Sequence, residues 1–97
     1  MKAYELLFFL HPTLEEEERE SAMQRIDSTI SAQGGVIDNI DNWGRRKLAY
    51  EIDKLQEGDY TLIDFHSEPS SIEEISRVLR ITDAVKRFMI VARTDRD

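Results

Sequence analysis

The 97-residue sequence contains no cysteine, which excludes disulfide bonds, thiolate metal sites and cysteine nucleophiles together. It has only two histidines, His11 and His66, and neither has a second histidine at helical spacing. No glycine-rich loop opens a helix to hold a phosphate, because Gly34-Gly35 follows a predicted helix. The sequence therefore predicts no metal and no cofactor.

Long hydrophobic runs are also absent. A membrane helix needs about 20 apolar residues, and no run in this chain approaches that length. The apolar stretch Leu6 to Leu10 is far too short, and only Lys2 precedes it, so a signal peptide is a poor interpretation. We expect a cytoplasmic protein that does not enter a membrane.

Convergent catalytic groups are missing as well. The run Glu15 to Glu18 resembles a carboxylate cluster, but on a helix successive side chains point about 100° apart. Those four residues are better explained as favourable charges at a helix start and a solvated face. The sequence predicts no enzyme and no small-molecule substrate.

Charge is plentiful and is segregated along the chain, which has a formal net charge of -7. Residues 1–43 and 55–76 are strongly acidic, whereas residues 44–54 and 77–93 carry an excess of lysine and arginine. One charge block is usually only a solvated face. Two basic blocks, each on or beside a predicted strand, favour a shared basic patch that meets a polyanion.

The first basic block begins with Trp43 and contains the triplet Arg45-Arg46-Lys47. Beyond the triplet the sequence alternates, with Leu48, Tyr50 and Ile52 on one side, as in a strand with one buried face. We expect Tyr50 to pack in the core rather than to stack on a base, because it shares a face with Leu48 and Ile52. Trp43 is a candidate for stacking on a base or a ribose.

The first half of the chain predicts a strand, a helix and a long strand. Residues 2–10 read as a strand that is apolar on both faces. In the helix that follows, Thr13 and Glu16 form a predicted capping box, and Gly34-Gly35 ends it. One predicted helical face carries Ala22, Met23, Ile26 and Ile30. Val36 to Asp53 is a long irregular strand with a predicted bulge at Gly44.

The second half repeats this order. Leu55 to Asp59 is predicted to turn the chain with Gly58 at the tip, and Tyr60 to His66 to form a strand with Ile63 and Phe65 buried. Pro69 to Glu74 then resembles the earlier helix start, with a hydroxyl cap. A helix lined by Ile72, Ile75 and Leu79 follows, and Val85 to Arg93 forms the last strand.

This order predicts one α+β domain over residues 1–97 with a ferredoxin-like split βαβ fold, a four-stranded antiparallel sheet and both helices on one face. Residues 93–97 are predicted to be a short flexible tail. The sheet face without helices would still hold apolar side chains, which are either scattered residues without meaning or a surface for a protein partner. These candidate partner residues are Leu7, Phe9, Met89 and Val91.

The predicted contacts to the polyanion are cations, because arginine can donate two hydrogen bonds to a phosphate and lysine acts as a point charge. Arg46 and Arg87 rank first, and Arg77 is expected instead to cap the negative end of the second predicted helix or to pair with Glu73 and Glu74. The third strand lacks a basic-glycine-aromatic motif, which argues against base stacking on the sheet. The full predicted set is Lys2, Arg45, Arg46, Lys47, Arg80, Lys86, Arg87 and Arg93.

Two segments carry a resemblance to a known family: Gly44-x-Arg46-x-Leu48-Ala49-Tyr50-x-Ile52 and Arg80-Ile81-x-Asp83-Ala84-Val85-x-Arg87. With them the chain resembles the sixth protein of the bacterial small ribosomal subunit, the S-six family. The resemblance begins at Tyr4-Glu5 and ends at the second of these segments, and Glu51 and Asp53 depart from the family pattern by adding negative charge beside the basic triplet.

This resemblance implies a non-catalytic ribosomal protein that binds the central domain of small-subunit ribosomal RNA. It also implies a heterodimer with the eighteenth small-subunit protein, a small basic partner that complements the acidic faces. An alternative from another class is a ligand-sensing or oligomerising regulatory domain of the same fold.

Overall fold

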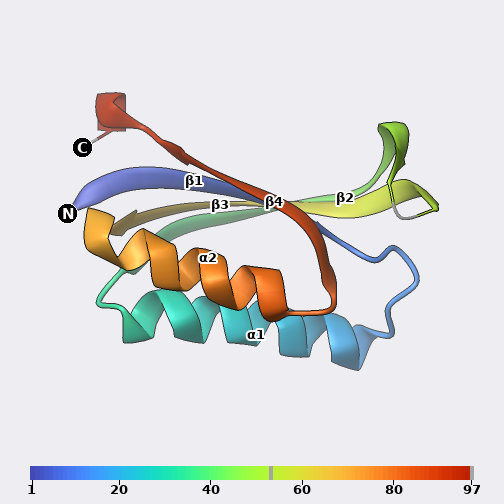
Figure 1. The fold of residues 1–97 in the computed structure, drawn as a ribbon, viewed down its shortest axis with the longest axis horizontal. Coiled ribbons are helices and arrows are strands. Elements are labelled where there is room, and N and C mark those ends of the chain that lie inside the picture. The colour runs from blue at the N-terminus through green and yellow to red at the C-terminus, as the bar shows by residue number, and fades with distance from the viewer. Residues whose placement is uncertain (53, 97) are drawn as a thin grey trace.

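The computed structural model describes residues 1–52 and 54–96. Its four strands form an antiparallel sheet in the order β2-β3-β1-β4, and both helices lie on one side of that sheet (Figure 1). The predicted ferredoxin-like split βαβ fold is therefore confirmed. The elements are β1 (Lys2–Leu10), α1 (Glu16–Ala32), β2 (Val36–Ile52), β3 (Leu55–Ser67), α2 (Ile72–Ile81) and β4 (Val85–Ala92), with 3₁₀ turns at Pro69–Ser71 and Thr94–Arg96.

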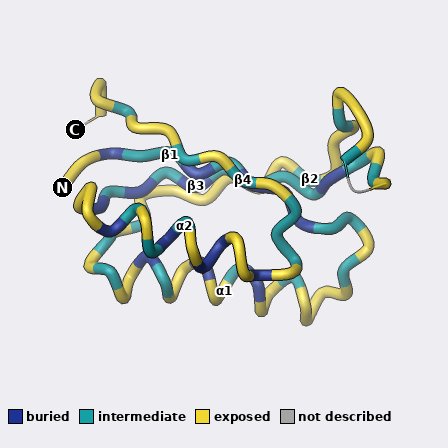
Figure 2. The backbone as a smooth tube through the Cα atoms, viewed as in Figure 1, coloured by how far each residue is buried: buried dark blue, intermediate teal, exposed yellow. Residues whose placement is uncertain are grey.

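The hydrophobic core lies between the sheet and the helices (Figure 2). In β1, every second residue points towards the helices, because side chains alternate between the two faces of a strand. The predicted stripe on α1 and the predicted buried pair on β3 are confirmed. The buried members of the core are Leu6, Phe8, Leu10, Ala22, Ile26, Ile30, Ile63, Phe65, Ile75 and Leu79.

The predicted capping boxes are wrong. Helix α1 begins at Glu16, so Thr13 lies too far upstream to cap it, and the Thr13 hydroxyl instead lies 2.9 Å from His11 Nδ1. Ser71 does occupy the residue before α2, but its hydroxyl donates to the carbonyl of Gln33 at 3.3 Å. That bond ties the start of α2 to the end of α1.

The end of α1 follows the prediction. Gly34 has a φ of +80°, in the left-handed region that favours glycine. Its backbone N–H donates to the carbonyl of Ser31, and the N–H of Gly35 donates to that of Ile30, both at 2.9 Å. These bonds satisfy carbonyl groups that the helix end would otherwise leave unpaired.

The predicted turn at Gly58 is also wrong, because β3 begins at Leu55 and the chain reverses between Ile52 and Leu55. Asp53, which the sequence places in the second strand, lies outside the described residues. Gly58 is buried within β3, and a Cβ atom built there would lie 2.5 Å from Cδ1 of Phe9. The glycine therefore serves close packing against an aromatic ring rather than a turn.

The sheet face opposite the helices is called the open face below. It carries Leu7 and Phe9 of β1 and, directly across from Leu7, Met89 of β4. Phe9 is only 3% exposed, whereas Met89 is 56% and Val91 41% exposed. No helix among the described residues is long and apolar enough to span a membrane.

Candidate nucleic-acid interface

A bulge in β2 organises the hairpin end of the open face. Asn42 pairs with Thr61 and Gly44 with Tyr60, so Trp43 is the extra residue between them. Gly44 has a φ of +77°, which favours glycine, and a Cβ atom there would meet no other atom within 4 Å. The bulge predicted at Gly44 is confirmed, and it places the indole of Trp43 against the ring of Tyr60.

Three aromatic rings form a row across the open face. The ring centroids of Trp43 and Tyr60 lie 6.3 Å apart with an interplanar angle of 29°, and those of Tyr60 and Phe9 lie 5.2 Å apart. The indole Nε1–H donates to a carboxylate oxygen of Asp41 at 3.1 Å. This hydrogen bond and the stacking fix the orientation of a side chain that is still 39% exposed.

Cations surround this aromatic row, which consists of Trp43, Tyr60 and Phe9. Arg46 and Lys47 line the same hollow as Trp43 and Tyr60, and Arg87 lies directly across from Phe9 on β4. None of the three cations forms an ion pair with any residue that the structure describes. The hairpin end therefore presents exposed positive charge beside an exposed aromatic face.

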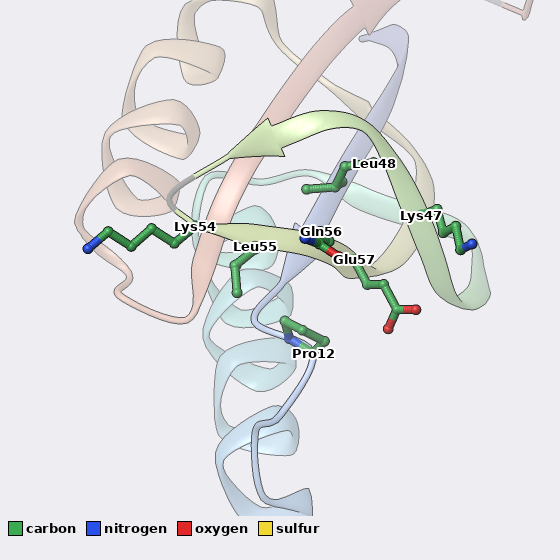
Figure 3. Close-up of a pocket in the computed structure, with 7 residues that line it drawn as sticks. All are labelled: Pro12, Lys47, Leu48, Lys54, Leu55, Gln56 and Glu57. Atoms are coloured by element: carbon green, nitrogen blue, oxygen red, sulfur yellow. The ribbon is translucent and has the colours of Figure 1, made fainter.

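A second hollow lies under the β2–β3 hairpin, between its strands and the loop that follows β1 (Figure 3). Lys47 and Lys54 project on opposite sides of it, while Pro12 lies across from Leu48 and Leu55. Lys47 lines both hollows and so stands on the ridge between them. Lysine side chains therefore project from both sides of the hairpin.

The C-terminal end of the open face differs, because its arginines are paired. Arg93 bonds to Glu5 and Asp95, and Arg96 lies 2.9 Å from Asp64. Hydrogen bonds to Asp95 and Glu5 raise the pKa of Arg93, and the bond from Arg93 lowers the pKa of Asp95. The flexibility expected for residues 93–97 stays a prediction, and Asp97 lies outside the described residues.

The remaining predicted RNA residues are not gathered at one place. Arg45 donates to the carbonyl of Pro12 at 3.1 Å, on the side of the sheet that faces the helices. Arg80 is exposed on α2, and Lys86 precedes the core-facing residue Phe88 by two positions on β4. Lys2 lies at the opposite end of β1 from the hairpin. Of the predicted cations, the structure brings Arg46 and Lys47 together, with Arg87 on the same face.

Two further expectations are settled by exposure and pairing. Tyr50 is 67% exposed, so the expectation that it lies in the core is wrong. The strand pairing of β2 shifts between Lys47 and Ile52, which removes the regular alternation on which that expectation depended.

Arg77 pairs with Glu74 as predicted, with nitrogen-to-oxygen distances of 2.6 and 2.7 Å. These bonds lower the pKa of Glu74 and raise that of Arg77.

Sequence reasoning missed Tyr60 as part of the site. Its signal was present, because Tyr60 precedes the buried pair on β3 by an odd number of residues and therefore points away from the helices.

The described residues contain no group of three histidine, aspartate or glutamate side chains that would hold a metal ion.

Comparison with known proteins decides the family. The family model for ribosomal protein S6 matches residues 3–92. The chain belongs to the ribosomal protein S6 family. It is 52% identical over 91 residues to the small ribosomal subunit protein bS6 of Clostridium novyi, a match that covers 94% of this chain and 96% of that protein.

Solved structures agree with this family. The crystal structure of 30S ribosomal protein S6 from Thermotoga maritima superposes with a TM-score of 0.91 at 37% identity, over 97% of this chain and 89% of that one. The C-terminal domain of MgtC from Mycobacterium tuberculosis gives a TM-score of 0.64 at 11% identity, over 97% of this chain and 89% of that one, which shows a shared fold alone. The chain is thus a structural protein of the small ribosomal subunit in the bacterial cytoplasm, and the S6 family is not enzymatic.

Proposed function

We propose that this S6-family protein binds the central domain of small-subunit ribosomal RNA jointly with the eighteenth small-subunit protein. The observation that carries the RNA half is the hairpin end of the open face. There Arg46, Lys47 and Arg87 lie beside the aromatic row without ion pairs among the described residues, while Arg93 and Arg96 are paired elsewhere. Unpaired cations can neutralise phosphates without first breaking an internal salt bridge.

The protein half of the proposal is supported by exposed apolar area and by charge. Leu7 is half-buried between neighbouring strands, and the exposed Met89 and Val91 extend the apolar surface along β4. Phe9 is only 3% exposed and packs against the ring of Tyr60, so it supports this surface without adding exposed apolar area. A net charge of -7 favours a basic partner and opposes RNA binding by the isolated protein.

The alternative of a ligand-sensing or oligomerising domain depended on the fold alone. Family membership at 52% identity outweighs a fold likeness at 11% identity, because one fold hosts many unrelated functions. The two hypotheses also differ in what they expect of the pure protein. Sedimentation should show a monomer, whereas a stable homodimer would favour the alternative.

The test is binding to a central-domain fragment of small-subunit ribosomal RNA, with and without the basic partner, across a salt series. We expect tight binding only with the partner, because the negative net charge opposes binding by the isolated chain. Affinity should fall with salt by roughly 0.7 to 0.9 log units per phosphate contact. The absence of binding under both conditions would contradict the proposal.

A further inference from the structure

The hollow beside the bulge has the composition of a nucleotide site. It measures about 490 Å³ and is lined by Trp43, Arg46, Lys47 and Tyr60. Two of these residues are aromatic and two are cationic, and none of the described residues that line the hollow is a carboxylate. Aromatic faces and cations are the two groups that bind a base and its phosphate in sites for single-stranded nucleic acid.

The indole is held in a position suited to stacking. Asp41 accepts the hydrogen bond from its Nε1–H, and Tyr60 lies against one side of the ring system. These contacts limit rotation of the Trp43 side chain, so little side-chain entropy remains to be lost when a ligand binds. Gly44 adds no side chain next to Trp43, and a Cβ atom built there would have no neighbour within 4 Å outside residues 43 and 45.

The cations are placed for the phosphate of the same nucleotide or of its neighbour. Arg46 lies two residues beyond Gly44 on β2, and Lys47 follows on the ridge that borders the hollow under the hairpin. Neither pairs with a described carboxylate, so both remain available. The planar guanidinium group of Arg46 can also stack on the face of a base.

An unpaired nucleotide fits this arrangement better than a duplex or a peptide. Stacking on an aromatic face requires a base that has left its own helix, because paired bases are covered on both faces. A peptide would need backbone partners or an apolar pocket, whereas this hollow combines one exposed aromatic face with two cations.

We propose that Trp43, supported by Tyr60, stacks on one unpaired base of RNA while Arg46 and Lys47 bind the adjoining phosphates. This inference depends on the proposed function only for the choice of RNA as the polymer. It also revises the expectation that bases do not stack on this sheet, because the stacking residue lies on β2 rather than in a motif on the third strand.

Trp43 is the only tryptophan in the chain, so its fluorescence reports on the site directly. At low ionic strength we expect short oligoadenylate and oligouridylate to quench its emission in a saturable manner. Duplex RNA of the same length should quench it at least tenfold less, since it offers no exposed base face. An acidic peptide should leave the emission unchanged. Absence of quenching by single strands, or equal quenching by duplex or peptide, would overturn the inference.

Variants separate stacking from charge in the complex with the partner and labelled central-domain RNA. Trp43→Leu should weaken binding about tenfold, whereas Trp43→Phe keeps an aromatic face and should stay near wild type. The matched control for charge is Arg25→Ala against Arg46→Ala, because Arg25 is exposed on α1 and is not among the predicted RNA contacts. Circular dichroism checks that each variant is folded.

The two proposals can fail separately. If wild type binds RNA with the partner but Trp43→Leu binds equally well, the nucleotide site is wrong and the proposed function stands. If wild type binds no central-domain RNA, the proposed function fails, and quenching by the oligonucleotides alone decides the nucleotide site.

Discussion

The open face of the sheet ends at the β2–β3 hairpin on one side and at residues 93–96 on the other, and arginines lie at both ends. At the C-terminal end, Arg93 and Arg96 bond to Glu5, Asp64 and Asp95. At the hairpin end, Arg46 and Arg87 have no ion pair with a described residue; Arg46 lines a hollow with the exposed Trp43, and Arg87 lies across from the buried Phe9. The same residue type is thus paired with carboxylates at one end of this surface and lacks a described carboxylate partner at the other.

The comparison shows that counting cations along the sequence does not locate an RNA site. A phosphate must compete with every carboxylate that already holds an arginine, and a mostly buried carboxylate such as Glu5 would lose its hydrogen-bonded partner Arg93 in the exchange. Glu5 has only 17% of its side chain exposed, so that loss is unfavourable. The predictions below test this difference between the two ends.

The largest expected effect comes from removing both hairpin-end arginines. Arg46→Ala with Arg87→Ala should weaken binding to central-domain RNA in the presence of the partner by about 2–4 kcal/mol, because each loses a charge-assisted contact. Both residues are exposed, so the thermal unfolding midpoint should hardly change. Filter binding and a melting curve measure the two quantities. Unchanged affinity in the folded double variant would show that the hairpin end does not contact RNA.

The next largest effect concerns the close packing of Gly58 against Phe9 near the hairpin. Gly58→Ala should lower the free energy of unfolding by about 1–3 kcal/mol, because the new Cβ would overlap the Phe9 ring. Urea unfolding measures the change. Combining it with Phe9→Leu should cost less than the sum of the two single changes, since the smaller side chain relieves the overlap. Full additivity would indicate that Gly58 is required for another reason.

The bulge itself should tolerate substitution better. Gly44→Ala has no steric cost beyond the backbone, so it should destabilise the protein by only about 1 kcal/mol through its positive φ. Gly44→Asn is the matched control, because asparagine enters the left-handed region more readily than alanine does. Urea unfolding should place Asn between Gly and Ala. A loss as large as that of Gly58→Ala would contradict this assignment.

The smallest effect is the pH dependence of the C-terminal end. The hydrogen bond from Arg93 lowers the pKa of Asp95 below its ordinary value of 3.8. The stabilising contribution of the Arg93–Asp95 pair is therefore complete above the ordinary pKa of Asp95 and is lost as the pH falls through its lower folded-state pKa. Protection of the amides of residues 94–96 against exchange, measured relative to the intrinsic rate at each pH, should fall over that interval, and Asp95→Asn should remove this fall. Unchanged protection would show that the pair does not order this segment.

Most of the fold could be predicted from the sequence, because it depends on patterns that a chain shows locally. The alternation in β1 and the stripe on α1 identify the core side of each element without any knowledge of its neighbours. Gly34 could be predicted to end α1 because a left-handed residue at a helix end is also a local requirement.

The errors came from residues whose role depends on a distant partner. Gly58 reads as a turn glycine, but its role is set by the ring of Phe9, which lies 49 positions earlier in the chain. Tyr50 keeps its alternation in the sequence while the strand pairing shifts, so it is exposed. Thr13 has the spacing of a cap, but the chain stays non-helical until Glu16.

The candidate site was predictable in part for the same reason. The basic triplet and Trp43 are contiguous, so the sequence points to that strand. The pairing of Arg93 with Glu5 joins residues from the two ends of the chain, and nothing local reveals it. Tyr60 joins the site only through the register between β2 and β3.

One measurement compares the two ends directly. The salt dependence of binding to central-domain RNA, in the presence of the partner, should be determined for two variants that each lose two positive charges: Arg46→Ala with Arg87→Ala, and Arg93→Ala with Arg96→Ala. Both change the net charge equally, so any difference between them reports local contacts with phosphate. We expect the slope of log affinity against log salt to shrink by roughly 1.4 to 1.8 for the first variant and to stay near wild type for the second. Equal slopes for the two variants, or a larger loss at the C-terminal end, would contradict the assignment of RNA binding to the hairpin end.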